Sequence, residues 1–260
     1  MKKLTLKEQR NDPRYTCSLL LHGNGKLLDF DDPESCISYR YAQFNQRAIK
    51  DCPLRSEGCE AVCYATKGNH QFPEVKASRE RSHAESLRED FPERILYTIS
   101  VEKQSKRYKN AVMLIRLHES GDFYSVQYLR KWVKIWKSLP DGVKVVLYTK
   151  SFPFFLMLTE EEKEIIRETM HSGKLSMNLS MDDTTTTAQK VAYLRMLKEF
   201  PLCNTYTCTE NVDEVEHDEV CKCEDCARCG VCNNSNGRKT AVKIHSASEN
   251  DLRKYRKAKK

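Results

Sequence analysis

The chain has 260 residues, of which 39% are hydrophobic and 31% charged, and its formal net charge is +7. This composition allows a real core. No apolar run approaches the roughly 20 residues that span a bilayer, which excludes a membrane-spanning protein. Residues 1–10 are mostly polar and lack the apolar stretch of a secretory signal, so we expect a cytoplasmic protein. Its 12 cysteines then favour metal ligation, because reducing thiol pools oppose disulfides.

The length fits one core domain with a small appendage. Residues 1–45 form an N-terminal segment, in which residues 17–21 resemble a short strand and Asn24 with Gly25 resembles a hairpin turn. An α/β core over residues 46–200 follows.

The core begins with a polar loop that carries Cys52, Cys59 and Cys63. Three cysteines on one loop can ligate three irons of a [4Fe-4S] cluster and leave the fourth iron open for a substrate or cofactor. The alternatives are a structural zinc site, completed by His70 or a remote ligand, and buried thiols that act as small hydrophobic side chains.

Residues 73–100 are charged and rich in helix-forming residues, and the apolar positions that could pack are Val75, Ala84, Leu87, Ile95 and Ile99. From residue 112 a strand-then-helix pattern occurs three times. The predicted strands are residues 112–117, 143–148 and 175–181, and the predicted helices are residues 125–139, 159–170 and 187–200.

Ser125 is a predicted N-cap, and Thr159 begins a capping box with Glu162. The buried stripe of the third helix is predicted to be Val191, Leu194, Met196 and Leu197. Parallel strands with helical crossovers form either an open doubly wound sheet or a barrel, and both collect their chemistry at the carboxyl ends of the strands.

Polar side chains follow each of the three strands. His118 follows the first strand as a ligand, a proton carrier or a hydrogen-bonded core histidine. Lys150 follows the second and could bind an anionic group. Asn178, Ser180 and Asp182 are placed at the end of the third. We expect these groups to converge on a pocket for a small molecule.

Residues 201–247 form a small cysteine-rich C-terminal module. Cys226, Cys229 and Cys232 are spaced as C-x2-C-x2-C, and Cys208, Cys221 and Cys223 precede them. Such density indicates a metal site, either a four-cysteine zinc site or an auxiliary [4Fe-4S] cluster. The remaining cysteines, Cys17, Cys36 and Cys203, are interpreted as ordinary thiols.

Residues 248–260 form a basic tail. A short terminal run of cations is either a solubilising end or a contact for nucleic acid through counterion release. The oligomeric state is not predicted.

Three motifs resemble a bacteriophage family called gene product 88. They are residues 52–68 with their cysteines, residues 116–125 around Ser120-Gly121-Asp122, and residues 148–151. The resemblance extends over roughly residues 46–245. This family and the related gene product 37 family are in turn similar to the radical S-adenosylmethionine superfamily.

That resemblance implies an incomplete (β/α) barrel-like parallel sheet. It also implies that Ser120, Gly121 and Asp122 hold the amino group of S-adenosylmethionine, and that Cys208 joins Cys226, Cys229 and Cys232 as ligands. The superfamily's cysteine gaps are three and two residues, with an aromatic residue before the last cysteine. Here the gaps are six and three, and Tyr64 follows the last cysteine.

Two functions are therefore expected from the sequence. The first is an iron-sulfur enzyme of the radical S-adenosylmethionine kind with one or two [4Fe-4S] clusters, in which His118, Asp122 and Lys150 act in catalysis and Asn178 and Ser180 help to bind the cofactor. The second is a non-catalytic protein in which zinc stabilises both sites and the basic tail contacts nucleic acid or a host protein.

Overall fold

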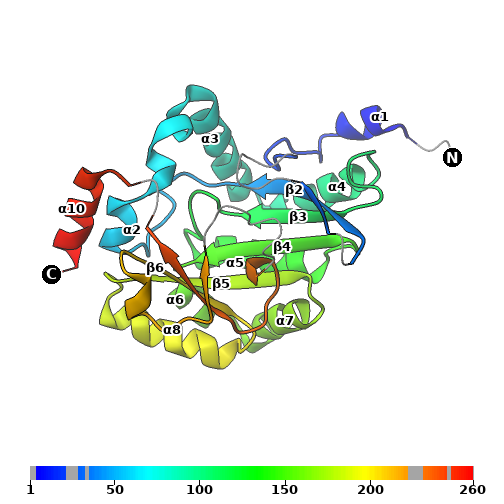
Figure 1. The fold of residues 1–260 in the computed structure, drawn as a ribbon. Coiled ribbons are helices and arrows are strands. Elements are labelled where there is room, and N and C mark those ends of the chain that lie inside the picture. The colour runs from blue at the N-terminus through cyan, green and yellow to red at the C-terminus, as the bar shows by residue number, and fades with distance from the viewer. Residues whose placement is uncertain (1–3, 22–28, 33–34, 222–230, 245–246, 260) are drawn as a thin grey trace.

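The computed structural model describes residues 4–21, 29–32, 35–221, 231–244 and 247–259. Its centre is an eight-stranded sheet curled into a half-barrel, with the strand order β1-β2-β3-β4-β5-β6-β8-β7 (Figure 1). The strands are β1 (Phe30–Asp32), β2 (Ile37–Phe44), β3 (Val112–Leu117), β4 (Val143–Thr149), β5 (Leu175–Asp182), β6 (Asn204–Thr209), β7 (Glu219–Cys221) and β8 (Lys239–Lys243).

All neighbouring strands are parallel except β1, which is antiparallel to β2. The predicted incomplete barrel-like α/β fold is confirmed. Because the strands run in one direction, the residues that follow them gather at one edge of the sheet. The sheet also takes in β2 from residues 1–45 and β6 and β8 from residues 201–247.

Helices lie between most of the strands in the chain, and several of them cover the outer face of the sheet. They are α1 (Leu6–Arg10), α2 (Glu57–Ala61), α3 (Pro73–Leu87), α4 (Phe91–Glu102), α5 (Val126–Lys137), α6 (Phe152–Leu156), α7 (Glu160–His171), α8 (Thr187–Glu199) and α10 (Glu249–Ala258). Within the described ranges, none of the helices is both long and apolar enough to cross a bilayer.

The two faces of each strand differ because side chains alternate across a sheet. The outward residues pack with the helices in one large core, which includes Trp132 and Trp136 of α5. The inner face has a much smaller apolar cluster of Tyr41, Leu114 and Val146. Polar and aromatic side chains fill the rest of the inner face, so this face differs from an ordinary core.

The predicted strands and helix caps agree with the structure. The Ser125 hydroxyl accepts a hydrogen bond from the Tyr128 amide at 3.1 Å, and Thr159 and Glu162 form the predicted capping box. Residues 17–21 are wrong as a strand, since they contribute only an isolated antiparallel bridge between Leu20 and Gln43. The Asn24-Gly25 turn lies outside the described residues.

The buried face of α8 was predicted wrongly in part. Val191 and Leu194 are 54% and 62% exposed, whereas Met196 is buried as expected. Tyr193 packs its ring against Phe152 of α6, with 5.9 Å between the ring centroids. Tyr193 lies beside the predicted stripe, so α8 is rotated about its own axis relative to the prediction.

The packing of residues 73–100 was also predicted only in part. Ile95 and Ile99 are buried in the core, but Ala84 and Leu87 are exposed. Polar residues of α3, including Arg79, are buried instead. The helix therefore serves to hold a polar loop rather than to extend the core.

Candidate functional site at the strand ends

The cysteine loop, residues 45–72, joins β2 to α3 and carries Cys52, Cys59 and Cys63. Ser56 begins α2, and its hydroxyl accepts a hydrogen bond from the Cys59 amide at 3.1 Å. The same hydroxyl donates to the carboxylate of Asp182 at the end of β5. The Gly58 amide donates to Oγ1 of Thr184 at 2.8 Å. The loop is thereby fixed over the carboxyl edge of the sheet.

A buried ion pair lies beneath this attachment. Lys150 Nζ is 2.8 Å from Oδ2 of Asp182 and donates to the Ser180 carbonyl at 3.2 Å. Burial alone would raise the pKa of Asp182, but Lys150 and the hydrogen bonds from Ser56 and Thr184 outweigh it and lower that pKa. Asp182 is therefore ionised and joins β4, β5 and the cysteine loop.

The three thiols share one electrostatic environment. Burial and the charge of Asp122 raise the pKa of Cys52, and Cys59 and Cys63 raise it further. Burial raises the pKa of Cys59 to about 11 although Lys150 opposes the shift. Burial also raises the pKa of Cys63. In the metal-free protein these thiols are protonated near neutral pH.

Each of these thiols also has a neighbour that favours its ionised form, as metal binding requires. The neighbours are the Ile49 amide for Cys52, the Lys150 ammonium for Cys59, and the Ala65 and Thr66 amides for Cys63. Among the residues that the structure describes, no three His, Cys, Asp or Glu side chains are arranged to hold one metal ion. A [4Fe-4S] cluster binds each thiolate through a different iron, so its ligands need not meet at one point. Three thiolates are the donors that such a cluster takes, and cluster binding at this loop remains a prediction.

The raised thiol pKa values predict slow alkylation. At pH 8, Cys59 of chelator-treated protein is expected to react with iodoacetamide roughly 100-fold more slowly than an unperturbed cysteine, because little thiolate is present. The exposed Cys17 and Cys36 are the internal controls. Peptide mass spectrometry over time measures the rates. Equal labelling of Cys59 and Cys17 would contradict this account.

Asp122 accepts hydrogen bonds from residues at the ends of two neighbouring strands. Its carboxylate accepts hydrogen bonds from the Phe123 amide at 2.8 Å, the Thr149 hydroxyl at 2.8 Å and the Lys150 amide at 2.9 Å. Burial raises the pKa of Asp122 and these donors oppose the shift. A carboxylate offers about four acceptor positions, and a hydrogen bond from Ser151 also lowers the pKa of Asp122, so these groups occupy most of its acceptor positions. The role of Asp122 in cofactor binding remains a prediction.

Ser120 and Gly121 join the end of β3 to the start of the cysteine loop. The Ser120 hydroxyl donates to the Gln46 carbonyl at 2.5 Å. Gly121 has φ +81°, and a Cβ there would lie 2.4 Å from Cβ of Gln46. Only glycine permits this close contact between the two segments.

Gly121→Ala is expected to lower the free energy of unfolding by about 2 kcal/mol, from the left-handed backbone and the overlap with Gln46. Gly173→Ala is the matched control, because Gly173 has φ +70° but open space around it. It should lose only about 1 kcal/mol. Urea denaturation compares the two variants, and equal losses would show that the contact with Gln46 is unimportant.

His118 turns into the aromatic core. It has φ 58°, its Nε2 is 2.9 Å from the Tyr128 hydroxyl, and its ring packs edge-on against Phe123. Burial lowers the pKa of His118 to about 3, so the ring is neutral. This geometry favours the hydrogen-bonded core histidine among the roles expected from the sequence.

Asn178 lies inside β5 rather than at its end. Its Nδ2 donates to the carbonyls of Leu147 and Cys232, both at 3.0 Å, and its Oδ1 accepts from Asn204 at 3.1 Å. These contacts occupy Asn178 in holding the segment around Cys232 on the inner face. Its role as a cofactor ligand remains a prediction.

The second cysteine set is described only in part, because Cys226 and Cys229 lie outside the described residues. Cys208 of β6 is level with Asp182 in the sheet. Burial raises the pKa of Cys208, while Lys150 opposes the shift and Cys59 adds to it. Cys208 therefore lies near the first cysteine set, and its grouping with the C-terminal cysteines is still a prediction.

Part of the basic tail is a helix that docks on the cysteine loop, and Figure 1 shows α10 beside α2. Tyr255 is fully buried, and its hydroxyl accepts from the Asp183 amide at 3.2 Å. Lys67 Nζ is 2.5 Å from Oδ2 of Asp251. A Cβ on Gly58 would lie 2.5 Å from the Tyr255 ring. This helix closes one side of the loop.

Arg79 of α3 supports the loop from the other side and had no recognisable sequence signal. Its guanidinium donates to the Ala65 carbonyl at 3.2 Å and lies 2.6 Å from Nδ1 of His70. His70, considered above as a zinc ligand, uses this nitrogen to contact Arg79. Arg79 and His70 lie nine positions apart on different elements, so no helix or strand periodicity predicts their contact.

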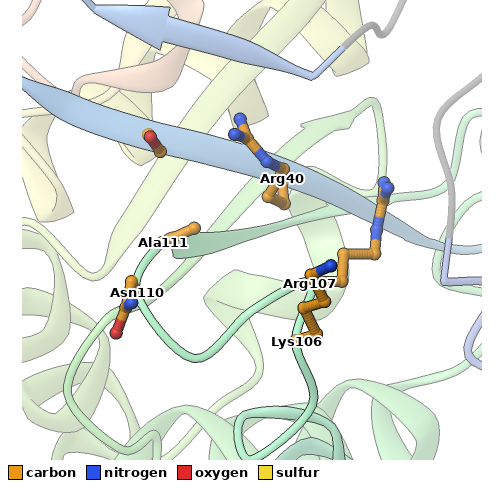
Figure 2. A pocket seen from close by; sticks show the side chains of 6 residues that line it. Arg40, Lys106, Arg107, Asn110 and Ala111 are labelled. Atoms are coloured by element: carbon orange, nitrogen blue, oxygen red, sulfur yellow. The ribbon is translucent and has the colours of Figure 1, made fainter.

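A cavity of about 540 Å³ lies at the opposite, amino-terminal edge of the sheet. Figure 2 shows Arg40, Lys106 and Arg107 around it. Arg40 pairs with Asp31 at 2.9 Å and Arg107 pairs with Asp29 at 2.7 Å. Acidic partners already neutralise these arginines, so the strand-end site is the better candidate.

The fold and site define a mixed α/β half-barrel with a three-cysteine loop over its carboxyl edge. The family model of gene product 88 matches residues 18–234, and the chain therefore belongs to the gene product 88 family. The match confirms the family resemblance of the motifs and reaches further toward the N-terminus than those motifs, so that it includes β2. No curated protein and no solved structure matches the chain.

Proposed function

We propose that this protein is an iron-sulfur enzyme of the radical S-adenosylmethionine kind, in which Cys52, Cys59 and Cys63 hold a [4Fe-4S] cluster with one open iron. The observation that carries the proposal is the position of the three thiols. They lie on the loop that follows the first parallel strand, over the edge at which the strands end. In parallel α/β sheets this edge is where ligands bind and reactions occur.

A bound cluster of this kind would supply single electrons and an iron site for a chelating ligand. Groups of the chain itself favour the thiolate form that would bind the cluster. The Ile49, Ala65 and Thr66 amides and the Lys150 ammonium favour thiolates that burial disfavours. The hydrogen bonds of Ser56 to Asp182 and of Gly58 to Thr184 fix the part of the loop that carries Cys59 at the end of β5.

The strand-end residues supply polar groups for a small-molecule cofactor. Asp122 is a carboxylate at the strand ends, and its charge suits an ammonium group. Gly121 allows the backbone to approach closely. The resemblance of Ser120-Gly121-Asp122 to the superfamily's cofactor-binding segment agrees with this assignment.

The test is reductive cleavage of S-adenosylmethionine. The full chain is reconstituted with iron and sulfide without oxygen and is then given dithionite and S-adenosylmethionine. Dithionite would supply the electron that breaks the bond between sulfur and the ribose carbon and releases methionine, and the adenosyl fragment would take its hydrogen atom from the buffer or the protein. We expect equal amounts of methionine and 5'-deoxyadenosine, measured by chromatography. Cys59→Ala treated identically is the control, and an intact cluster without cleavage would defeat the radical mechanism.

A further inference from the structure

The inner face of the sheet carries a cationic side chain, Arg116, that belongs to none of the contacts described above. Arg116 of β3 places its guanidinium carbon 4.1 Å from the centroid of the Tyr148 ring. Tyr148 in turn contacts Tyr206 edge-on, with 5.0 Å between the ring centroids. The Tyr64 hydroxyl, one residue after Cys63, donates to the Glu119 carbonyl. Arg116 therefore lies on the sheet face beneath the cysteine loop.

Arg116 is charged, but it has no carboxylate partner among the residues that the structure describes. Burial opposes its charge, but Tyr148, Tyr64 and Glu119 outweigh burial and raise the pKa of Arg116. Within the described part of the chain, no carboxylate lies within ion-pair distance of it, and its Nε is buried without a hydrogen-bond acceptor. By comparison, Arg47 makes a two-pronged pair with Asp51.

An arginine in this setting has a stability cost, because buried donors that lack acceptors lose their hydrogen bonds to water. The planar guanidinium fits a carboxylate or phosphate through two parallel hydrogen bonds. The ring of Tyr148 fixes the plane of the guanidinium. An incoming oxyanion would supply the acceptor that Nε lacks among the described residues.

We propose that Arg116 binds an oxyanion, a carboxylate or phosphate group on the small-molecule substrate of the strand-end site, between Tyr148 and the cysteine loop. The inference names the substrate class for the function proposed above and rests on that function. Binding of the anion itself requires no cluster, so the two proposals can fail separately.

Calorimetric titration of the metal-free full chain with inorganic phosphate and with benzoate tests the site. We expect saturable binding of one probe per chain, and the stronger probe identifies phosphate or carboxylate chemistry. Arg116→Met should weaken binding at least tenfold with little change in the thermal midpoint, because the loss of the contact with the Tyr148 ring is offset by the removal of a buried unpaired donor. Arg116→Lys keeps the charge but loses the two parallel hydrogen bonds of the guanidinium, so it should bind the probe several-fold more weakly than wild type.

Arg40→Met is the matched control, since Arg40 lines the basic cavity at the opposite edge of the sheet (Figure 2). It should leave binding unchanged. The proposal is overturned if neither probe binds, if Arg116→Met binds as wild type does, or if Arg40→Met abolishes binding. Formation of 5'-deoxyadenosine without oxyanion binding would remove this inference and leave the proposed function intact.

Discussion

Alanine at Cys52, Cys59 or Cys63 is expected to remove about four iron and about four sulfide per chain from anaerobically reconstituted protein, because each thiolate holds a different iron. The three single variants should lose the same amount, since a cluster with two protein ligands left on one loop is poorly held. Iron and acid-labile sulfide analysis measures the loss as a difference from wild type. The difference is independent of any metal at the C-terminal cysteines.

Cys17→Ala and Cys36→Ala are the matched controls, because both thiols are exposed and lie outside the cysteine loop. They should keep the wild-type iron content. Cys232→Ala tests the second set and should leave the four irons of the loop in place. An iron content that falls equally in the Cys36 and Cys59 variants would mean that iron binds without a defined site.

Lys150→Met is expected to lower the free energy of unfolding by about 3–5 kcal/mol, because it leaves the buried Asp182 carboxylate without its cation. The loss should also loosen the cysteine loop, whose Ser56 hydroxyl bonds to the same carboxylate. Denaturant unfolding measures the first effect. Faster hydrogen exchange at the Cys59 amide measures the second, since that amide donates to Ser56.

The pH dependence of this variant has a definite sign. Lys150 helps to lower the pKa of Asp182 below its ordinary value of 3.8, so the pair stabilises the fold above that pH and the contribution is lost as pH falls through the lowered pKa. In Lys150→Met, burial should raise the pKa of Asp182. The gap between variant and wild type should therefore shrink in acid. Lys150→Met combined with Asp182→Asn should recover much of the loss at neutral pH.

Local signals allowed much of the sheet to be predicted. Strands β3 and β4 are largely apolar, β5 alternates apolar and polar residues, and caps such as Thr159 involve residues only three positions apart. Strand β2 was missed because its inner-face residues Tyr39, Tyr41 and Gln43 are aromatic or polar and do not give the pattern of a buried apolar strand. Strand β6 is rich in threonine and tyrosine for the same reason.

The candidate site was predicted in its residue types but not in its connections. The three cysteines and Asp122 were recognisable from composition and position in the chain. The bond from Ser56 to Asp182 joins residues 126 positions apart, and no pattern in the chain announces such a contact. His118 turned toward the core because its backbone adopts φ 58°, which periodicity does not reveal. Arg116 lies within the motif of residues 116–125 and had no sequence signal of its own, because the absence of a carboxylate partner among the described residues is visible only in three dimensions.

Elemental analysis of freshly isolated wild-type protein, purified without oxygen, tests the central claim most directly. The account predicts a brown, oxygen-labile protein with thiolate-to-iron charge-transfer absorption and at least about four iron and about four sulfide per chain. A colourless protein that contains zinc alone, or no metal, would contradict it.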